Sequence, residues 1–364
     1  MNDKARKLLG ILLIISLVTL LIQVMLGGIT RLTGSGLSMT EWKVIAGTIP
    51  PLNETQWQEK FELYKTIPQY QLLNNSMNLS EFKSIFFWEW AHRVWGRIGF
   101  VFLLGIFAIM GLRKQLDKRG IWLFGVLLLL YFFQGLLGWF MVYSGLSELV
   151  YVSHYRLAAH LLGALFLFAF ILWWAADLLV PLNNKVHSPP LKKAAWGLTF
   201  LIVVQIIFGA FMSGLRAAGR YASWPDMNGQ MVPDNLFMEG MPFLLNFSEN
   251  HATIQFTHRG LAYLLCFLML WYWSKARKFR GGRPWFSRAV NLLPILLACQ
   301  VALGITTLLL SSGDYVPVFW GVVHQFMGLT LLSTMLFVNF QYTNVENVEK
   351  TSISTHKERD LVRS

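Results

Sequence analysis

The sequence predicts an all-α polytopic membrane protein with eight transmembrane helices in two tandem four-helix bundles. Three observations support this fold class. The chain of 364 residues is 55% hydrophobic and only 14% charged, which is too apolar for a soluble protein of this length. Its apolar residues form eight runs near the ~20 residues that cross the hydrocarbon core of a bilayer. Short segments of the first four runs recur in the last four.

The eight predicted spans leave two long loops on one side of the membrane. The spans cover residues 8–28, 88–112, 121–143, 155–180, 194–214, 256–274, 289–310 and 318–340. The first span resembles a signal peptide, but its apolar run is long and lacks a small-x-small cleavage site, so we interpret it as retained. The long loops are residues 31–87 and 215–255. Long ordered loops usually line a site, and we therefore expect function at the outer face.

One further helix is expected inside the first long loop. Asn53 followed by Gln56 resembles a helix capping box, and Trp57, Phe61 and Tyr64 continue at helical spacing. The pattern predicts an amphipathic helix that either lies on the membrane surface or packs only on its protein neighbours.

The distribution of basic residues predicts the orientation. Of 31 Lys and Arg residues, 20 lie in the terminal segments and the loops on their side, seven lie in the opposite loops, and four lie within spans. Because positively charged loops remain in the cytoplasm, both termini are predicted to be cytoplasmic. The membrane expected for this chain is a bacterial inner membrane. The net charge of +12 then reflects contact with anionic lipid, and no nucleic-acid partner is expected.

Four matched pairs of segments form an internal repeat with offsets of 164 to 182 residues. The pairs are Gln23 and Gly27 with Gln205 and Gly209, His92 and Arg93 with His258 and Arg259, Gln134 to Gly138 with Gln300 to Gly304, and His160 with His324. Their order predicts an N-terminal half, residues 1–190, a C-terminal half, residues 191–345, and a cytoplasmic tail, residues 346–364. Four spans per half give both halves the same direction, so they are related by a pseudo-two-fold axis along the membrane normal. The glycines are interpreted as small residues that let helices approach.

Five of the eight histidines lie in or near the outer half of a predicted span, where a polar side chain needs a partner. Four of them are in register across the repeat: His92, His160, His258 and His324. Two opposed imidazoles without carboxylate or thiolate companions suit the axial positions of a haem iron, whereas zinc requires three or four ligands. We therefore predict that His92 pairs with His160 and His258 with His324. The fifth, His154, has no counterpart and is interpreted as a helix-start or pocket residue.

The residues beside the first histidine of each pair differ between the halves. Arg93 and Arg259 follow the histidines and either bind haem propionates or extend to lipid headgroups. Glu89 precedes its histidine by three residues, while Gln255 holds the matching position in the second half. A carboxylate near a haem edge can move protons, and Glu89 can equally pair with Arg93 one turn on. The asymmetry predicts a reactive first half and a second half that holds a haem.

Together these segments resemble the haem A synthase family, the membrane enzymes of cytochrome oxidase assembly. The resemblance covers residues 8–340 and is carried by residues 27–39, 89–93, 155–160, 257–260 and 323–325. Some family members have a cysteine pair in the first outer loop. This chain has only Cys266 and Cys299, both inside apolar runs, so it is more similar to the mitochondrial and proteobacterial-like branch.

The resemblance implies an oxidoreductase that oxidises the C8 methyl group of haem O to a formyl group, giving haem A. By position, His92 and His160 would bind the substrate haem O with Glu89 assisting the oxidation, and His258 and His324 would ligate the iron of a haem b cofactor. A cofactor must carry the oxidising chemistry, because no ordinary side chain is a strong enough oxidant for a methyl group. A haem O synthase and a second copy of the chain are candidate partners, and the electron partner is not identified.

Two other functions are compatible with parts of the pattern. A di-haem b-type electron-transfer cytochrome would explain the four histidines but not the presence of Glu89 in one half only. A transporter with a polar path would carry no haem. Chromatographic identification of the haem product separates an oxygenase from both, because only an oxygenase alters the macrocycle.

Overall fold

The computed structural model describes residues 1–42, 46–147, 151–181, 185–279 and 281–342. The predicted tail, residues 346–364, lies outside these ranges. Within them the chain is helical, and the β contacts are isolated bridges outside any strand. Seven of the described helices are long and apolar enough to cross a membrane. They are α1 (Asp3–Leu32), α4 (Leu79–Leu112), α5 (Lys118–Ser147), α6 (His154–Leu179), α7 (Pro189–Gly214), α10 (Pro284–Leu309) and α11 (Val318–Phe340).

The sixth predicted span, residues 256–274, corresponds to α9 (His251–Ala276). This helix has 26 residues but is not among the seven, because polar residues such as His258 and Arg259 near one end and Lys275 at the other lower its apolarity. Asn250 caps its first turn by accepting a hydrogen bond from the backbone of Ala252 at 2.9 Å. His251, expected in a loop, is therefore the first residue of α9.

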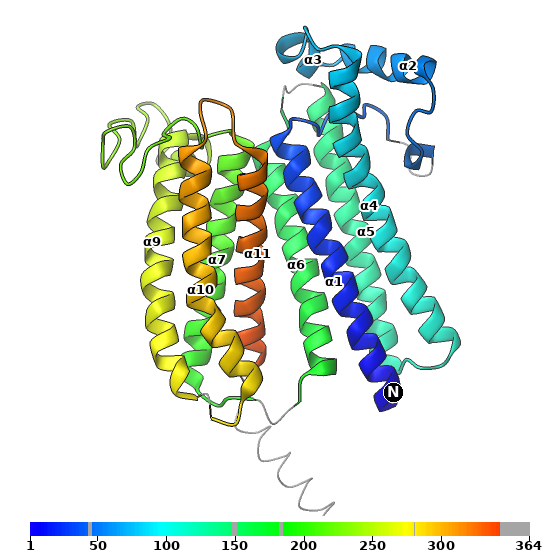
Figure 1. The fold of residues 1–364 in the computed structure, drawn as a ribbon, viewed down its shortest axis with the longest axis vertical. Helices are drawn as coiled ribbons and strands as arrows, with labels where there is room; N and C mark the ends of the chain where they lie inside the picture. The colour runs from blue at the N-terminus through cyan, green and yellow to red at the C-terminus, as the bar shows by residue number, and fades with distance from the viewer. Residues whose placement is uncertain (43–45, 148–150, 182–184, 280, 343–364) are drawn as a thin grey trace, which may run out of the picture.

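The long helices run side by side in two groups (Figure 1). One group contains α1, α4, α5 and α6, and the other contains α7, α9, α10 and α11. Contacts of α6 with α7 and of α1 with α11 join the groups. The first group has its own buried apolar core, while the core of the second also includes Val24 of α1 and Ala164 and Leu165 of α6. α1 and α6 thus pack toward both groups.

α1 and α11 meet closely at Gly28 of α1. A Cβ on Gly28 would lie 2.1 Å from the amide oxygen of Gln325, so only glycine leaves room for this side chain. The amide nitrogen of Gln325 donates to the carbonyl oxygen of Val24 at 3.3 Å. A polar side chain of the second group is therefore docked on the backbone of the first.

α4 begins nine residues before the predicted span because its start is fixed by a capping box. The side chain of Asn78 accepts from the backbone of Glu81, whose carboxylate accepts from the backbone of Asn78. The resulting 34 residues give a helix roughly 51 Å long, well beyond the ~30 Å hydrocarbon core. α4 therefore extends past the membrane on the side of the long loops.

The extended end of α4 supports the helices of the first loop, α2 (Glu54–Lys65) and α3 (Pro68–Leu73) (Figure 1). Asn53 caps α2 as predicted, but the side chain of Gln56 accepts from the backbone of Leu52 at 2.8 Å, one residue earlier than in a capping box. Phe61 and Tyr64 are buried and lie 5.1 and 5.2 Å from the ring of Phe82 in α4. The apolar face of α2 thus packs on its protein neighbours.

Three short helices complete the described fold. The first long loop also contains a 3-10 helix (Ala46–Thr48), the second long loop contains α8 (Phe243–Glu249), and another 3-10 helix (Arg277–Phe279) follows α9.

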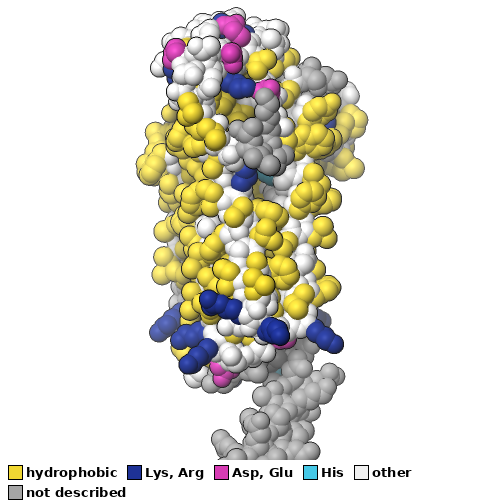
Figure 2. Space-filling model, turned by 90° about the vertical axis from the view of Figure 1, so that its right-hand side faces the viewer, with side chains coloured by type: hydrophobic (Ala, Val, Ile, Leu, Met, Phe, Trp, Pro, Cys, Tyr) yellow, Lys and Arg dark blue, Asp and Glu magenta, His cyan; other side chains and the backbone are white. Residues whose placement is uncertain are grey.

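Figure 2 shows one side of the molecule, where hydrophobic side chains cover most of the height. Lys and Arg gather at the end where the N-terminus lies, and the opposite end carries α2 and α3. Because the basic ends of membrane proteins remain in the cytoplasm, this distribution predicts that the end with the N-terminus faces the cytoplasm. The end that carries α2 and α3 is then on the opposite side of the membrane.

We expect a reporter fused at Lys118, which begins α5 at the basic end, to be active in the cytoplasm. A reporter fused at Asn75, between α3 and α4, should be active outside. A fusion at Asn228, in the second long loop, is the matched control and should behave like Asn75. An outside signal at Lys118 would refute the arrangement.

Candidate functional site

Each of the four repeated histidines lies against a glycine of the preceding long helix. The nearest imidazole atom of His92 would lie 3.2 Å from a Cβ placed on Gly27, and that of His160 would lie 3.1 Å from a Cβ on Gly138. The corresponding distances are 3.4 Å for His258 and Gly209 and 2.9 Å for His324 and Gly304. At Gly27, Gly138 and Gly304 the ring is closer than a neighbouring side chain normally allows, whereas at Gly209 the distance is that of an ordinary van der Waals contact. Interpreting these glycines only as contacts between helix backbones was incomplete, because they make room for the imidazoles.

Each group of helices contains two of the four histidines. His92 of α4 lies near His160 of α6 in the first group, and His258 of α9 lies near His324 of α11 in the second. All four residues are partly buried. Each group of four helices thus brings together two imidazoles.

A glutamine lies one turn before each of these glycines and reaches the histidine helix. The amide nitrogen of Gln134 donates to the carbonyl oxygen of His160 at 2.8 Å and lies 3.2 Å from its Nδ1. That of Gln205 donates to the carbonyl oxygen of His258 at 3.0 Å, and that of Gln300 lies 3.3 Å from Nε2 of His324.

Three of these glutamines in turn lie against a glycine of the helix that carries the histidine. A Cβ on Gly96, Gly163 or Gly328 would lie 3.3, 2.4 or 3.3 Å from the amide of Gln23, Gln134 or Gln300. The contact is therefore reciprocal, with a histidine over one glycine and a glutamine over another. The sequence contained the signal, since Gln and Gly recur four residues apart in the first, third, fifth and seventh predicted spans.

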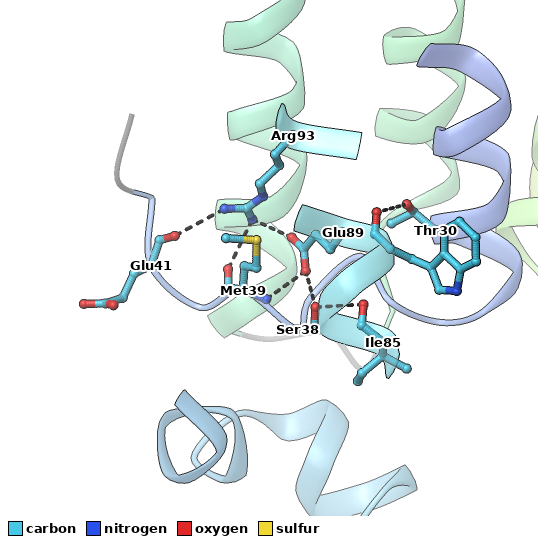
Figure 3. Close-up of polar contacts among 8 residues, drawn as sticks. Thr30, Ser38, Met39, Glu41, Ile85, Glu89 and Arg93 are labelled. Carbon is cyan, nitrogen blue, oxygen red and sulfur yellow. Dashed lines mark hydrogen bonds and ion pairs between the residues drawn. The ribbon is translucent and has the colours of Figure 1, made fainter. Parts of the chain in front are cut away.

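Glu89 is only 2% exposed, and its carboxylate accepts three hydrogen bonds (Figure 3). One oxygen accepts from the hydroxyl of Ser38 at 2.7 Å and from the backbone of Met39 at 2.8 Å. The other lies 2.5 Å from Nη2 of Arg93, which also donates to the carbonyl oxygen of Met39, while Nη1 of Arg93 donates to that of Glu41. The buried ion pair thus ties the segment after α1, residues 38–41, to the outer part of α4.

The second half uses the matching positions in the same way. Gln255 donates to the carbonyl oxygens of Ala218 and Tyr221 at 3.1 and 3.2 Å. Arg259 donates to those of Tyr221 and Asp226 at 2.8 and 2.6 Å. In both halves, the residue three positions before the first histidine and the arginine directly after that histidine bind the same loop. This loop follows the first long helix of the half. Only the first half does so with a carboxylate.

The loop held by Arg259 carries its own acidic residue outside the membrane. The hydroxyl of Ser223, followed by the backbone N–H of Gly229 and the charge of Arg259, lowers the pKa of the Asp226 carboxyl below its ordinary value. This carboxylate stays charged near Arg259, which supports the position of the loop.

His154 is the first residue of α6, in agreement with its interpretation as a helix-start residue. It is buried against the ring of Phe211 in α7, and its Nε2 lies 3.6 Å from a carboxylate oxygen of Glu249 in α8. It therefore contacts the other half and stands apart from the histidine pairs.

Comparison with known proteins places the chain in a family. A family model described as "Cytochrome oxidase assembly protein" matches residues 10–336. A protein named "Heme A synthase" from Nitrosomonas eutropha is 42% identical over 339 residues, covering 91% of this chain and 92% of the relative. One of the same name from Agrobacterium fabrum is 45% identical over 338 residues, covering 91% and 89%. Another from Flavobacterium johnsoniae is 40% identical over 338 residues, covering 92% and 97%. With its glycine-backed histidines inside the matched region, this chain belongs to the family of cytochrome oxidase assembly proteins that includes these heme A synthases.

Proposed function

We propose that this protein is a haem A synthase, a multi-pass membrane oxidoreductase that oxidises the C8 methyl group of haem O to a formyl group. The observation that carries the proposal is the set of four glycine-backed histidines in a chain whose relatives are named for this activity. We further propose that the first pair binds the substrate haem O and the second pair holds haem b.

The residues present fit a haem in each half. Two imidazoles from different helices of one group would be able to hold a haem iron between them. Within the described residues, no group of three or more His, Cys, Asp or Glu side chains is arranged to hold a metal ion. In the second half, Nδ1 of both His258 and His324 is buried without a hydrogen-bond partner. Such nitrogens are costly in a free protein, which supports a role as ligands.

Haem supplies the redox chemistry when bound, and the chain contributes binding, orientation and proton handling. In the first half, His92 and His160 orient the substrate between α4 and α6. Segment 38–41, held by Glu89 and Arg93, covers the outer part of α4 and limits the access of water. Glu89 is the carboxylate of this site and the candidate to accept a proton released during oxidation. We propose that Arg93 and Arg259 direct haem propionates with the donors that their loops do not use.

We also propose that α9 is the eighth membrane span. It is 26 residues long, like α7 and α10, and it packs against both. Equivalent glycine–histidine contacts in both groups support a pseudo-two-fold axis along the membrane normal and a boundary between the halves near residue 190. The basic end supports cytoplasmic termini in a bacterial inner membrane.

The proposed activity is tested by expressing the chain with a source of haem O and identifying the extracted haems by chromatography. Haem A should appear with the wild-type chain and be absent without it. An unchanged haem O pool together with two bound b-type haems would instead favour an electron-transfer cytochrome.

The assignment of haem b predicts different effects of the two histidine pairs. His258→Ala and His324→Ala should each abolish the low-spin haem b spectrum of the purified protein, because each removes an axial ligand. His92→Ala and His160→Ala should retain that spectrum and lose haem A formation. His187→Ala, outside the spans, is the control. Equal loss of haem b in His92→Ala and His258→Ala would contradict separate roles.

The glycine contacts predict a steric effect that needs no change of ligand. Gly304→Ala places a Cβ 2.9 Å from the ring of His324, so the ring must move and haem b occupancy should fall. Gly197→Ala in α7 is the matched control, because nothing lies within 4 Å of its Cβ position. The control should retain full occupancy, since alanine favours a helix more than glycine does. Equal occupancy in both variants would contradict the contact.

The role of Glu89 is separated from loop anchoring by two variants. Glu89→Gln should keep haem b but lower haem A formation about a hundredfold, the usual size of a general acid–base contribution. Ser38→Ala removes one hydrogen bond to the same carboxylate without changing its charge and should retain most activity. Comparable losses in both variants, with reduced protein yield, would assign Glu89 to anchoring alone.

A further inference from the structure

The internal repeat continues beyond the helices into the two long outer loops. Four residues of the first loop have an identical or similar residue 182 positions later in the second loop. The pairs are Trp42 with Trp224, Gly47 with Gly229, Ile49 with Met231 and Pro51 with Pro233. The same offset relates the glutamine and glycine of α1 to those of α7. The loop segments that follow these two helices are therefore equivalent parts of the two halves.

The contacts of the two segments with the helices are equivalent as well. Arg93 of α4 donates to the carbonyl oxygen of Met39 at 3.1 Å. Arg259 of α9 donates to the carbonyl oxygen of Tyr221, which is 182 residues after Met39, at 2.8 Å. Each loop is thus attached to the second helix of its half through the same backbone position.

Both segments lie beside their helix and not beyond its end. In the first, Nε1 of Trp90 in α4 donates to the carbonyl oxygen of Thr48 at 3.0 Å. In the second, Nε1 of Trp224 donates to the hydroxyl of Tyr263 in α9 at 3.1 Å. Trp90 and Tyr263 lie roughly 17 and 18 Å along their helices from the first residue. In Figure 1 the segment after α1 accordingly lies lower beside α4 than α2 and α3 do, and the second long loop lies beside the outer end of α9.

The two arginines mark the level at which the segments meet the membrane. Arg113, at the end of α4, is about 30 Å along the helix from Arg93, which equals the thickness of the hydrocarbon core. Lys275, near the end of α9, is about 24 Å from Arg259, and both long side chains can extend outward to span the rest. The outer boundary of the hydrocarbon core therefore falls near Arg93 and Arg259, where the segments are attached.

At this level each segment exposes an aromatic and an aliphatic side chain. Trp42 and Trp224 are 40% and 42% exposed, and Ile49 and Met231 are 66% and 71% exposed. Single exposed apolar residues are ordinary on a protein surface, but here the exposure recurs at matched positions of both halves. Tryptophan is enriched where lipid headgroups meet the acyl chains. The composition of both segments is therefore typical of a membrane interface.

Lipid is a neighbour that both segments share. α4 and α9 lie at opposite sides of the molecule (Figure 1). The exposed apolar surface of each helix continues toward the middle of the membrane, at Val101 of α4 and Phe267 of α9. A protein partner would have to cover two opposite sides at one depth, whereas a bilayer surrounds both. The observations thus favour lipid over a protein as the occupant.

We propose that residues 46–51 and 228–233, which we call the interfacial segments, insert their apolar side chains into the outer leaflet of the bilayer beside α4 and α9. Insertion beside α9 rests on the proposed eighth span, whereas α4 is by itself long and apolar enough to cross a membrane. Each outer loop is then held from two sides, by the arginine on the helix bundle and by lipid.

The test measures which reagents reach a spin label on the full chain in phospholipid vesicles. The two native cysteines, Cys266 and Cys299, are first replaced by Ala. Labels at Ile49→Cys and Met231→Cys should be relaxed by oxygen, which concentrates among acyl chains, and should lose relaxation by a water-soluble nickel chelate. Leu72→Cys in α3 is the matched control, because this apolar residue is 67% exposed but lies beside the extended end of α4. Nickel should reach it.

Reference labels define full contact with lipid. Val101→Cys of α4 and Phe267→Cys of α9 should be reached by oxygen and shielded from nickel, because both side chains are exposed in the middle part of a span. If a labelled loop variant yields no folded protein, Leu52→Cys beside the first interfacial segment and Val232→Cys within the second replace it, since both residues are exposed.

Two results would overturn the proposal. In one, nickel reaches the labels at Ile49 and Met231 as readily as the label at Leu72, so the segments lie in water. In the other, neither oxygen nor nickel reaches them, so a protein partner or a second copy covers them. Failure of the eighth span is recognised separately, because nickel would then reach Phe267 and insertion of the second segment would be refuted with it. The label at Ile49, compared with that at Val101, still decides the first segment.

Discussion

An imidazole inside an apolar helix bundle requires both room for its ring and a polar partner, and the architecture of this protein follows from that requirement. A glycine of the neighbouring helix faces each of the four rings, and at Gly27, Gly138 and Gly304 a Cβ would crowd the ring. Partners come from glutamines one turn away, which contact the histidine ring or its backbone at three of them. Helix pairing, small residues and polar residues are therefore not independent features. Each histidine therefore restricts which residues the facing helix can have over about one turn.

The loops are attached to this framework by the residues around the first histidine of each half. In the first half a buried carboxylate, neutralised by Arg93 and two further donors, holds segment 38–41. In the second half the neutral amide of Gln255 does the same for the loop after α7. Breaking a buried ion pair is far more destabilising than losing a neutral hydrogen bond. Loss of the ion pair that anchors the first loop would therefore destabilise the protein more than loss of the amide hydrogen bonds that anchor the second loop. The ion pair lies at the site where we propose the chemistry occurs.

Local sequence patterns predicted the helices well, because the length and apolarity of a membrane span are properties of one segment. The spans at 121–143 and 318–340, for example, lie within α5 and α11. The start of α4 was missed because the Asn78 capping box extends the helix beyond the apolar run. At the site, the repeat indicated which two histidines belong to each half, and their pairing as ligands stays a prediction. The ion pair of Glu89 remained one of two alternatives, and the glutamine contacts were not predicted. Both depend on which faces of different helices meet, which no single segment encodes.

The pair of glycines at positions 27 and 28 has a consequence for how this chain can change over evolutionary time. Gly27 accommodates His92 of its own half, while Gly28 accommodates Gln325, the residue next to His324 of the other half. Two adjacent residues of α1 are therefore constrained from opposite directions by the two repeats. Residues that serve separate groups of helices ordinarily vary independently. Here that freedom ends at α1, because a substitution that relaxes one half is immediately felt by the other.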